Sequence, residues 1–145
     1  MALTGWADDD EPQKWETLEG CELVKSALND GDSFSVKHRG ETYLFRLYWV
    51  DAPESIGTFV ERVQEQARYF SIPEEQVTDT GQLAKRHTRN FLRGEFTVHT
   101  KWADARGGKE KRFFAIVEKD DTYLSQHLID RGLARIYGMP TEDKW

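Results

Sequence analysis

Five charged residues stand in stretches of this chain whose neighbours favour uncharged strands or turns. They are Asp32, Arg46, Asp51, Glu54 and Arg112. Carboxylate oxygens are the ligands that hard divalent cations prefer, and the planar guanidinium group of arginine binds a phosphate through paired hydrogen bonds. Together, these residues could hold one divalent metal ion and one phosphate group.

The segment from residue 45 to residue 55 contains the clearest pattern. Arg46 interrupts an otherwise apolar strand, and Asp51 and Glu54 lie on either side of Ala52-Pro53 at its end. A guanidinium group buried without a partner is costly, which favours a functional role for Arg46. We therefore place the centre of the candidate site in this segment.

Each of these residues also has a purely structural interpretation. Asp32 lies in an Asn-Asp-Gly-Asp turn signal and could simply form the turn, and Asp51 could merely end a strand. Glu54 and Arg112, taken alone, are ordinary surface charges. Only the joint occurrence of the five residues argues for a site.

Phosphodiester hydrolysis needs a cation on the phosphate oxygens, a group that orients or deprotonates water, and donors for the charge that builds on the phosphorus. Asp32 and Asp51 are candidate metal ligands, and the backbone carbonyl of Ala52 could complete part of a calcium-like shell.

The two remaining tasks have candidates as well. Glu54, held in place by Pro53, is the candidate general base or water-orienting group. Arg46 and Arg112 are the candidate phosphate ligands, because a lysine does not offer the same bidentate geometry.

Charge is distributed unevenly along the 145 residues, which fit one compact domain. The formal net charge is −6, which alone argues against a nucleic-acid partner, but residues 1–20 carry six acids and one lysine. Residues 85–112 carry nine basic residues and three acids. This stretch is either a solvated surface or an electrostatic track for a phosphate polymer.

The sequence gives little support for a disulfide, a zinc site or a membrane-spanning segment. The single Cys21 forms neither an intrachain disulfide nor a cysteine-rich zinc site, and the four histidines lack ligand spacing. No apolar run is long enough to cross a bilayer. We expect a monomer without a membrane partner.

The pattern of apolar residues and turn signals predicts five strands and two or three helices. Strands are expected at residues 22–28, 33–38, 41–50, 95–102 and 112–118. Helices are expected at 59–70, around an inner face of Leu83, Ala84, His87 and Phe91, and from 121 or 122 to 131. The expected fold is α+β, a five-stranded OB-fold Greek-key barrel with helices packed on it.

Several motifs occur together in an order that resembles the staphylococcal-nuclease-like (thermonuclease) family. The resemblance covers roughly residues 22–137 and rests on Asp30-Gly31-Asp32, Phe45-Arg46-Leu47, Val50-Asp51-Ala52-Pro53-Glu54-Ser55, Lys111-Arg112-Phe113-Phe114-Ala115 and Gly132-Leu133-Ala134. It implies an OB-fold domain at residues 19–145. The polar, acidic composition of residues 1–18 predicts a flexible lead-in before this domain.

The family's activity would be a calcium-dependent endonuclease that hydrolyses DNA and RNA, prefers single-stranded or flexible regions, and leaves 3′-phosphates. By matching position, Asp32, Asp51 and the Ala52 carbonyl would bind Ca²⁺. Glu54 would activate water, and Arg46 and Arg112 would hold the phosphate. The candidate substrate-binding residues are Lys109, Lys111 and Tyr137.

The chain departs from the family at several positions. Ala52 replaces the usual threonine, and Glu110 stands where a tyrosine is common. Residues 55–80 are longer than the usual mobile loop, and we expect them to form a helical insert that acts as a lid.

The alternative is a non-catalytic OB-fold module that binds nucleic acid or protein. Relatives of that kind typically lose the charged site residues, whereas all five are present here. Carbohydrate recognition on the same barrel face is a more distant alternative.

Overall fold

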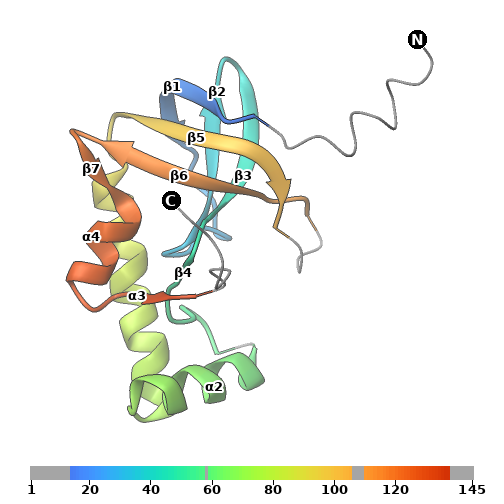
Figure 1. The fold of residues 1–145 in the computed structure, drawn as a ribbon. Helices are drawn as coiled ribbons and strands as arrows, with labels where there is room; N and C mark the ends of the chain where they lie inside the picture. Colours follow the sequence, from blue (N-terminus) through green and yellow to red (C-terminus); the bar gives the residue numbers. More distant parts are fainter. Residues whose placement is uncertain (1–13, 58, 106–109, 138–145) are drawn as a thin grey trace.

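A curled β-sheet forms the body of the protein in this computed structural model, which describes residues 14–57, 59–105 and 110–137 (Figure 1). Its main strands are β1 (Glu16–Leu23), β2 (Ser33–His38), β3 (Glu41–Leu47), β5 (Glu95–Asp104) and β6 (Phe113–Lys119). These strands pair in the order β3-β2-β1-β5-β6, and the short β7 (Thr122–Tyr123) pairs with β6.

Parallel pairing between β3 and β6 closes the sheet into a barrel. Phe45 lies opposite Phe113, and Arg46 lies opposite Phe114. The other main pairings are antiparallel. In the described part of the chain, the closed five-stranded mixed barrel and three helices confirm the expected α+β, OB-fold-like architecture.

Alternating apolar side chains fill the barrel, because successive residues of a strand point to opposite faces of a sheet. The fully buried ones include Phe34 and Val36 of β2 and Phe45 of β3. Leu124 and Leu128 of helix α4 (Leu124–Asp130) are also fully buried and belong to the same core.

The predicted first strand and lead-in were partly wrong. We predicted a strand at 22–28, but β1 runs from Glu16 to Leu23 and includes residues assigned to the lead-in. Its buried residues Leu18 and Cys21 are three apart because the pairing with β5 shifts register between them, where Gly20 has a φ of 71°. A β-bulge of this kind breaks the two-residue alternation used to recognise strands. Residues 1–13 lie outside the described part of the chain.

The predicted strand at 41–50 is also divided. β3 ends at Leu47, and a turn in which Trp49 has a φ of 59° separates it from β4 (Val50–Asp51). β4 pairs with β8 (Arg135–Ile136) in a separate two-stranded sheet. Because of this turn, Asp51 belongs to a different strand from Arg46.

Two helices connect the first and second halves of the barrel. α2 (Val60–Phe70) matches the predicted helix within one residue. α3 (Glu74–Phe91) starts inside the predicted insert and continues through the predicted second helix. Its buried face consists of Val77, Gly81, Ala84 and Thr88, whereas Leu83, expected inside, is 38% exposed. The predicted insert at 55–80 therefore does not end at residue 80, because α3 continues through that position.

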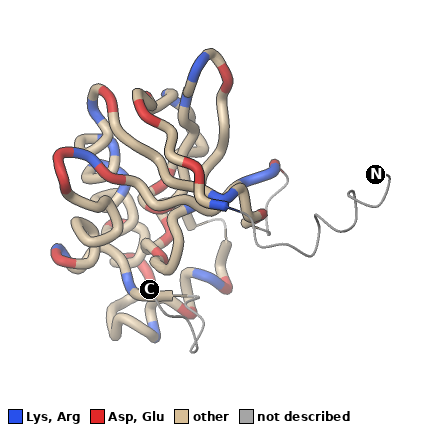
Figure 2. The backbone as a smooth tube through the Cα atoms, turned by 45° about the horizontal axis from the view of Figure 1, so that its top comes forward, with Lys and Arg blue, Asp and Glu red and all other residues tan. Residues whose placement is uncertain are grey.

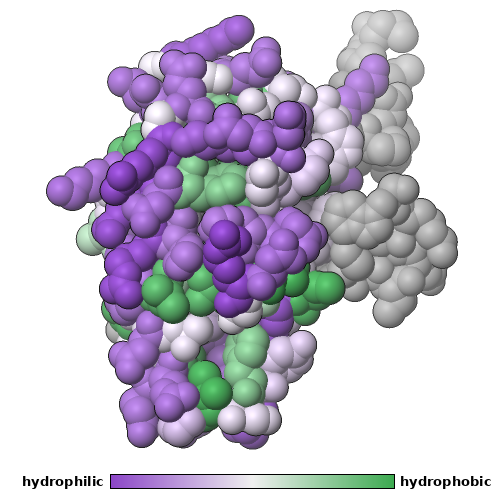
Figure 3. Space-filling view, turned by 90° about the vertical axis from the view of Figure 1, so that its left-hand side faces the viewer, coloured by the Kyte–Doolittle hydropathy of each residue, from purple (hydrophilic) through white to green (hydrophobic). Residues whose placement is uncertain are grey.

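The surface carries both signs of charge. Basic and acidic segments are interspersed along the chain (Figure 2). The described basic residues of 85–112 are divided among α3, the turn after it, β5 and the segment before β6. The face shown in Figure 3 is mostly hydrophilic, with hydrophobic residues in small separate areas. No helix in the described residues is long and apolar enough to cross a membrane.

Candidate active site

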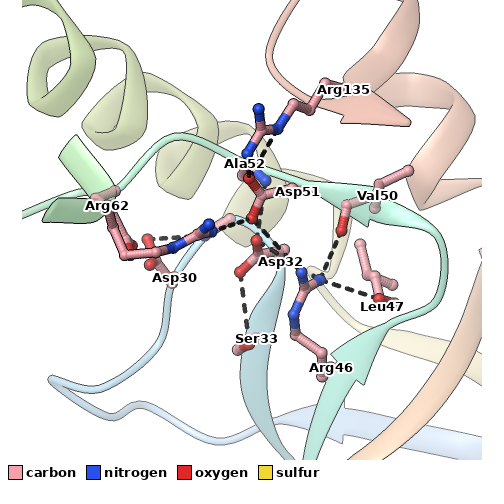
Figure 4. A network of polar contacts seen from close by, with 12 residues as sticks. Asp30, Asp32, Ser33, Arg46, Leu47, Val50, Asp51, Ala52, Arg62 and Arg135 are labelled. Atoms are coloured by element: carbon pink, nitrogen blue, oxygen red, sulfur yellow. Dashed lines mark hydrogen bonds and ion pairs between the residues drawn. The ribbon is translucent and has the colours of Figure 1, made fainter. Parts of the chain in front are cut away.

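Three of the predicted residues meet where the ends of β2, β3 and β4 come together (Figure 4). Asp32 immediately precedes β2, Arg46 lies on β3, and Asp51 ends β4. One terminal nitrogen of Arg46 is 3.6 Å from Asp32 Oδ2, and the other is 3.6 Å from Asp51 Oδ1. A single guanidinium group thus bridges two aspartates that are far apart in the sequence.

Backbone contacts hold these three side chains in place. Arg46 donates hydrogen bonds to the carbonyl oxygens of Leu47 and Val50 at 3.0 and 2.7 Å, so it also fixes the β3–β4 turn. The amide of Ala52 donates to Asp32 Oδ2 at 2.9 Å. These bonds and ion pairs offset the cost of burying the Arg46 side chain, which is only 13% exposed.

Glu54 lies on the segment after β4, against α3. A Cβ atom added at Gly81 of α3 would collide with the backbone carbonyl of Glu54 and lie 2.7 Å from the Pro53 carbonyl oxygen. The missing side chain at Gly81 is what lets the helix approach this closely. The Glu54 carboxylate is 3.5 Å from Nε of Arg62 on α2. Burial, followed by the nearby Asp32 carboxylate, raises the pKa of Glu54 despite the opposing charge of Arg62.

Arg112 reaches the same cluster through a serine. Its Nη1 donates to Ser33 Oγ at 3.3 Å, and Ser33 Oγ donates to Asp32 Oδ1 at 3.4 Å. The half-buried Arg112 lies just before β6, which the barrel closure places beside β3. All five predicted residues therefore converge in space.

The sequence prediction missed a second set of residues, contributed by α2 and β8. Arg62 of α2 donates to Asp51 Oδ1 at 2.7 Å, and Arg135 of β8 donates to Asp51 Oδ2 at 3.0 Å. Arg135 also makes two hydrogen bonds to the Glu65 carboxylate, at 2.7 and 2.6 Å. These bonds lower the pKa of Glu65.

Gln66 of α2 completes this set. Its side-chain amide contacts Asp51, Ala52 and Glu54. One signal was available in the sequence: Gln66 is a polar residue next to the buried positions Val63 and Ala67 on an amphipathic helix. Arg135 follows the Gly-Leu-Ala motif directly, but nothing in its local sequence indicated Asp51 as its partner.

Several carboxylates lie close together on one side of the site. Burial and the neighbouring Asp32 carboxylate raise the pKa of Asp30 to about 7, and the Glu54 carboxylate contributes to the same shift. Carboxylates that raise one another's pKa mark a place where a cation would be stabilised.

Asp32, Asp51 and the Ala52 carbonyl are the oxygen donors that a divalent cation could use here. No group of three Asp, Glu, His or Cys side chains in the described residues forms a coordination shell by itself. Calcium, however, also accepts carbonyl oxygens and water, and the candidate ligands here are Asp32, Asp51 and the Ala52 carbonyl. Asp51 Oδ2 accepts hydrogen bonds from Gln66 and Arg135, whereas Asp51 Oδ1 has one donor within hydrogen-bond distance, Arg62.

The three predicted substrate-binding residues differ in where the structure places them. Lys109 lies outside the described residues. Lys111 is exposed, with its ammonium group 5.4 Å from the centre of the Phe113 ring. Tyr137 is 45% exposed, and its ring lies 4.7 Å from the guanidinium carbon of Arg135 and 5.7 Å from that of Arg62. Tyr137 is therefore at the edge of the site.

Comparison of the sequence with protein-family models and with curated proteins finds no match.

Proposed function

We propose that this protein is a staphylococcal-nuclease-like, calcium-dependent endonuclease that hydrolyses single-stranded or flexible regions of DNA and RNA. The observation that carries the proposal is the bridge from Arg46 to Asp32 and Asp51, with Glu54 and Arg112 beside it. Two aspartates next to paired arginines combine metal-binding and phosphate-binding chemistry on one barrel edge.

The residues divide the reaction among them. A calcium ion held by Asp32, Asp51 and the Ala52 carbonyl would neutralise phosphate oxygens and polarise water. Glu54 accepts the proton of the attacking water, and its raised pKa makes it a better base near neutral pH. The water oxygen bonds to phosphorus and the bond from phosphorus to the 5′ oxygen breaks. The departing 5′ oxygen takes up a proton from solvent, which leaves a 3′-phosphate and a 5′-hydroxyl.

Arginine side chains stabilise the charge that grows on the phosphate during this step. Arg112 approaches from the β6 side of the cluster, and Arg46 from the β3 side. Because both are held by protein oxygen atoms, little reorganisation is needed when the substrate arrives.

The test is degradation of single-stranded DNA and RNA in calcium and in chelator. We expect cleavage in calcium alone and its loss in Arg46→Ala. The control Arg68→Ala changes an exposed arginine on α2 and should keep the activity of the original protein. Absence of cleavage by clean protein in calcium, or cleavage indifferent to Arg46→Ala, would reject the proposal.

A non-catalytic OB-fold binding module is the second candidate. One observation favours it: the oxygens of Asp51 are already hydrogen-bonded to Arg62, Gln66 and Arg135. Under this alternative the charged cluster is a structural network, and nucleic acid or protein binds without turnover. Binding of single-stranded DNA with equal affinity in calcium and chelator, and with no product, would select this candidate.

A further inference from the structure

One glutamine of α2 contacts three groups of the candidate site at once. Gln66 is fully buried, with 0% of its surface exposed. Its Nε2 donates to Asp51 Oδ2 at 3.0 Å and to the Ala52 carbonyl at 3.2 Å. Its Oε1 accepts a hydrogen bond from the Glu54 amide at 2.9 Å. Both ends of the side-chain amide are therefore used.

These contacts fix the relative orientation of the proposed metal ligands and the proposed base. The amide group of Gln66 is planar, so its donor end holds Asp51 and Ala52 while its acceptor end holds the backbone of Glu54. A buried amide is expensive unless it is hydrogen-bonded. A hydrophobic residue would suit this inner face of α2 on packing grounds alone.

We propose that Gln66 is a positioning residue for phosphodiester hydrolysis. It holds the Asp51 carboxylate, the Ala52 carbonyl and the Glu54 backbone in their working arrangement. This inference rests on the proposed function. Under this proposal α2 helps to position the groups of the site, whereas the sequence suggested that the insert containing it acts as a lid.

The test compares two substitutions of Gln66 with a matched control on the same helix. Gln66→Met keeps the length and helix propensity of the side chain but removes all three hydrogen bonds. Gln66→Glu keeps an acceptor for the Glu54 amide but loses the donors and adds a negative charge beside Asp51. Gln64→Met is the matched control, because it replaces glutamine by methionine at an exposed position two residues away on the same helix.

We expect Gln66→Met to lower kcat by about 10-fold or more, because small misplacements of reacting groups are costly. KM for a single-stranded oligonucleotide should stay within about twofold, because the residues that bind the rest of the substrate are unchanged. Gln64→Met should match the original protein in both constants. A purely structural role would lower the amount of folded enzyme without this split between kcat and KM.

Two further measurements do not depend on nuclease activity. Hydrogen exchange followed by NMR should show a protected Glu54 amide in the original protein and in Gln66→Glu, and loss of protection in Gln66→Met. Calorimetric titration with calcium should show weaker binding in Gln66→Met and no change in Gln64→Met. If the original protein binds calcium but cuts no nucleic acid, the proposed function fails while these results still decide the role of Gln66.

An unchanged kcat in folded Gln66→Met, or an unprotected Glu54 amide in the original protein, would overturn the inference. If Gln66→Met does not fold, Gln66→Glu decides the matter. It must then keep the Glu54 protection and lower kcat while KM stays within about twofold.

Discussion

At the scale of single residues, Arg46 is the most constrained group of the site. It bridges two aspartates and donates to two backbone carbonyls while its side chain is 13% exposed. Removing one partner of a buried ion pair leaves the other charges uncompensated. Arg46 therefore contributes to folding as well as to the proposed chemistry.

This dual role predicts a loss of stability in Arg46→Met. We expect the free energy of unfolding to fall by about 3 kcal/mol, because Asp32 and Asp51 lose their shared cation. Urea unfolding monitored by tryptophan fluorescence measures the change. Arg68→Met, at an exposed position of α2, should change the same quantity by less than about 0.5 kcal/mol. Equal stabilities of the two variants would contradict this description of Arg46.

Glu65 gives a prediction for pH dependence. Its hydrogen bonds to Arg135 lower its pKa from the ordinary value of 4.5. A carboxylate with a lowered pKa in the folded state adds stability above the unfolded pKa, and that stability is lost as the pH falls through the folded pKa. The stability difference between the original protein and Glu65→Gln should therefore shrink as the pH falls from about 6 to about 3. A difference that stays constant over this range would show that the ion pair contributes nothing.

The sequence revealed only the residues of the site that stand out locally. Arg46 is conspicuous because it interrupts an apolar strand, and Asp51 and Glu54 flank a proline. Arg62 and Arg135 are ordinary charged residues in their own segments. Their role depends on α2 and β8 meeting at Asp51, a tertiary contact that no local pattern encodes.

At the scale of elements, α3 packs against the two backbone segments that carry Asp32 and Glu54. Gly31 and Gly81 are both places of close approach: a Cβ at Gly31 would lie 2.9 Å from the Cβ of Ala84. Thr88 of α3 also donates to the Gly31 carbonyl at 2.7 Å. The helix thus contacts the backbone beside both Asp32 and Glu54.

Gly81→Ala tests this close approach. Alanine normally stabilises a helix relative to glycine, but here it would collide with the Glu54 backbone. We expect a loss of about 2 kcal/mol in the free energy of unfolding and a shift of the Glu54 amide resonance. Gly57→Ala is the matched control, since a Cβ there meets no atom of the described residues within 4 Å. A stabilised Gly81→Ala protein would contradict the packing described here.

Element boundaries were predictable where periodicity was regular. β2 was predicted at its observed limits, and α2 within one residue. β1 was misplaced because its bulge interrupts the alternation, and α3 was predicted too short because its inner face contains glycine, alanine and threonine in place of large apolar residues. Both errors have the same cause. A hydrophobic pattern predicts which residues are buried only where the buried residues are large, apolar and regularly spaced.

At the scale of the whole molecule, barrel closure is what assembles the site. The parallel pairing of β3 with β6 joins the first and second halves of the chain and places the segment carrying Arg112 beside Asp32. The α2–α3 segment connects the two halves (Figure 1). Its helix α2 contributes Arg62 and Gln66 to the site. The five residues recognised in the sequence therefore need the complete barrel, whatever reaction they perform.

Cleavage of an end-labelled single-stranded DNA in calcium by the original protein and by Glu54→Gln tests the central proposal most directly. We predict products with 3′-phosphate ends from the original protein and a rate about 100-fold to 10,000-fold lower for Glu54→Gln. Equal rates for the two proteins, or no calcium-dependent product from either, would contradict it.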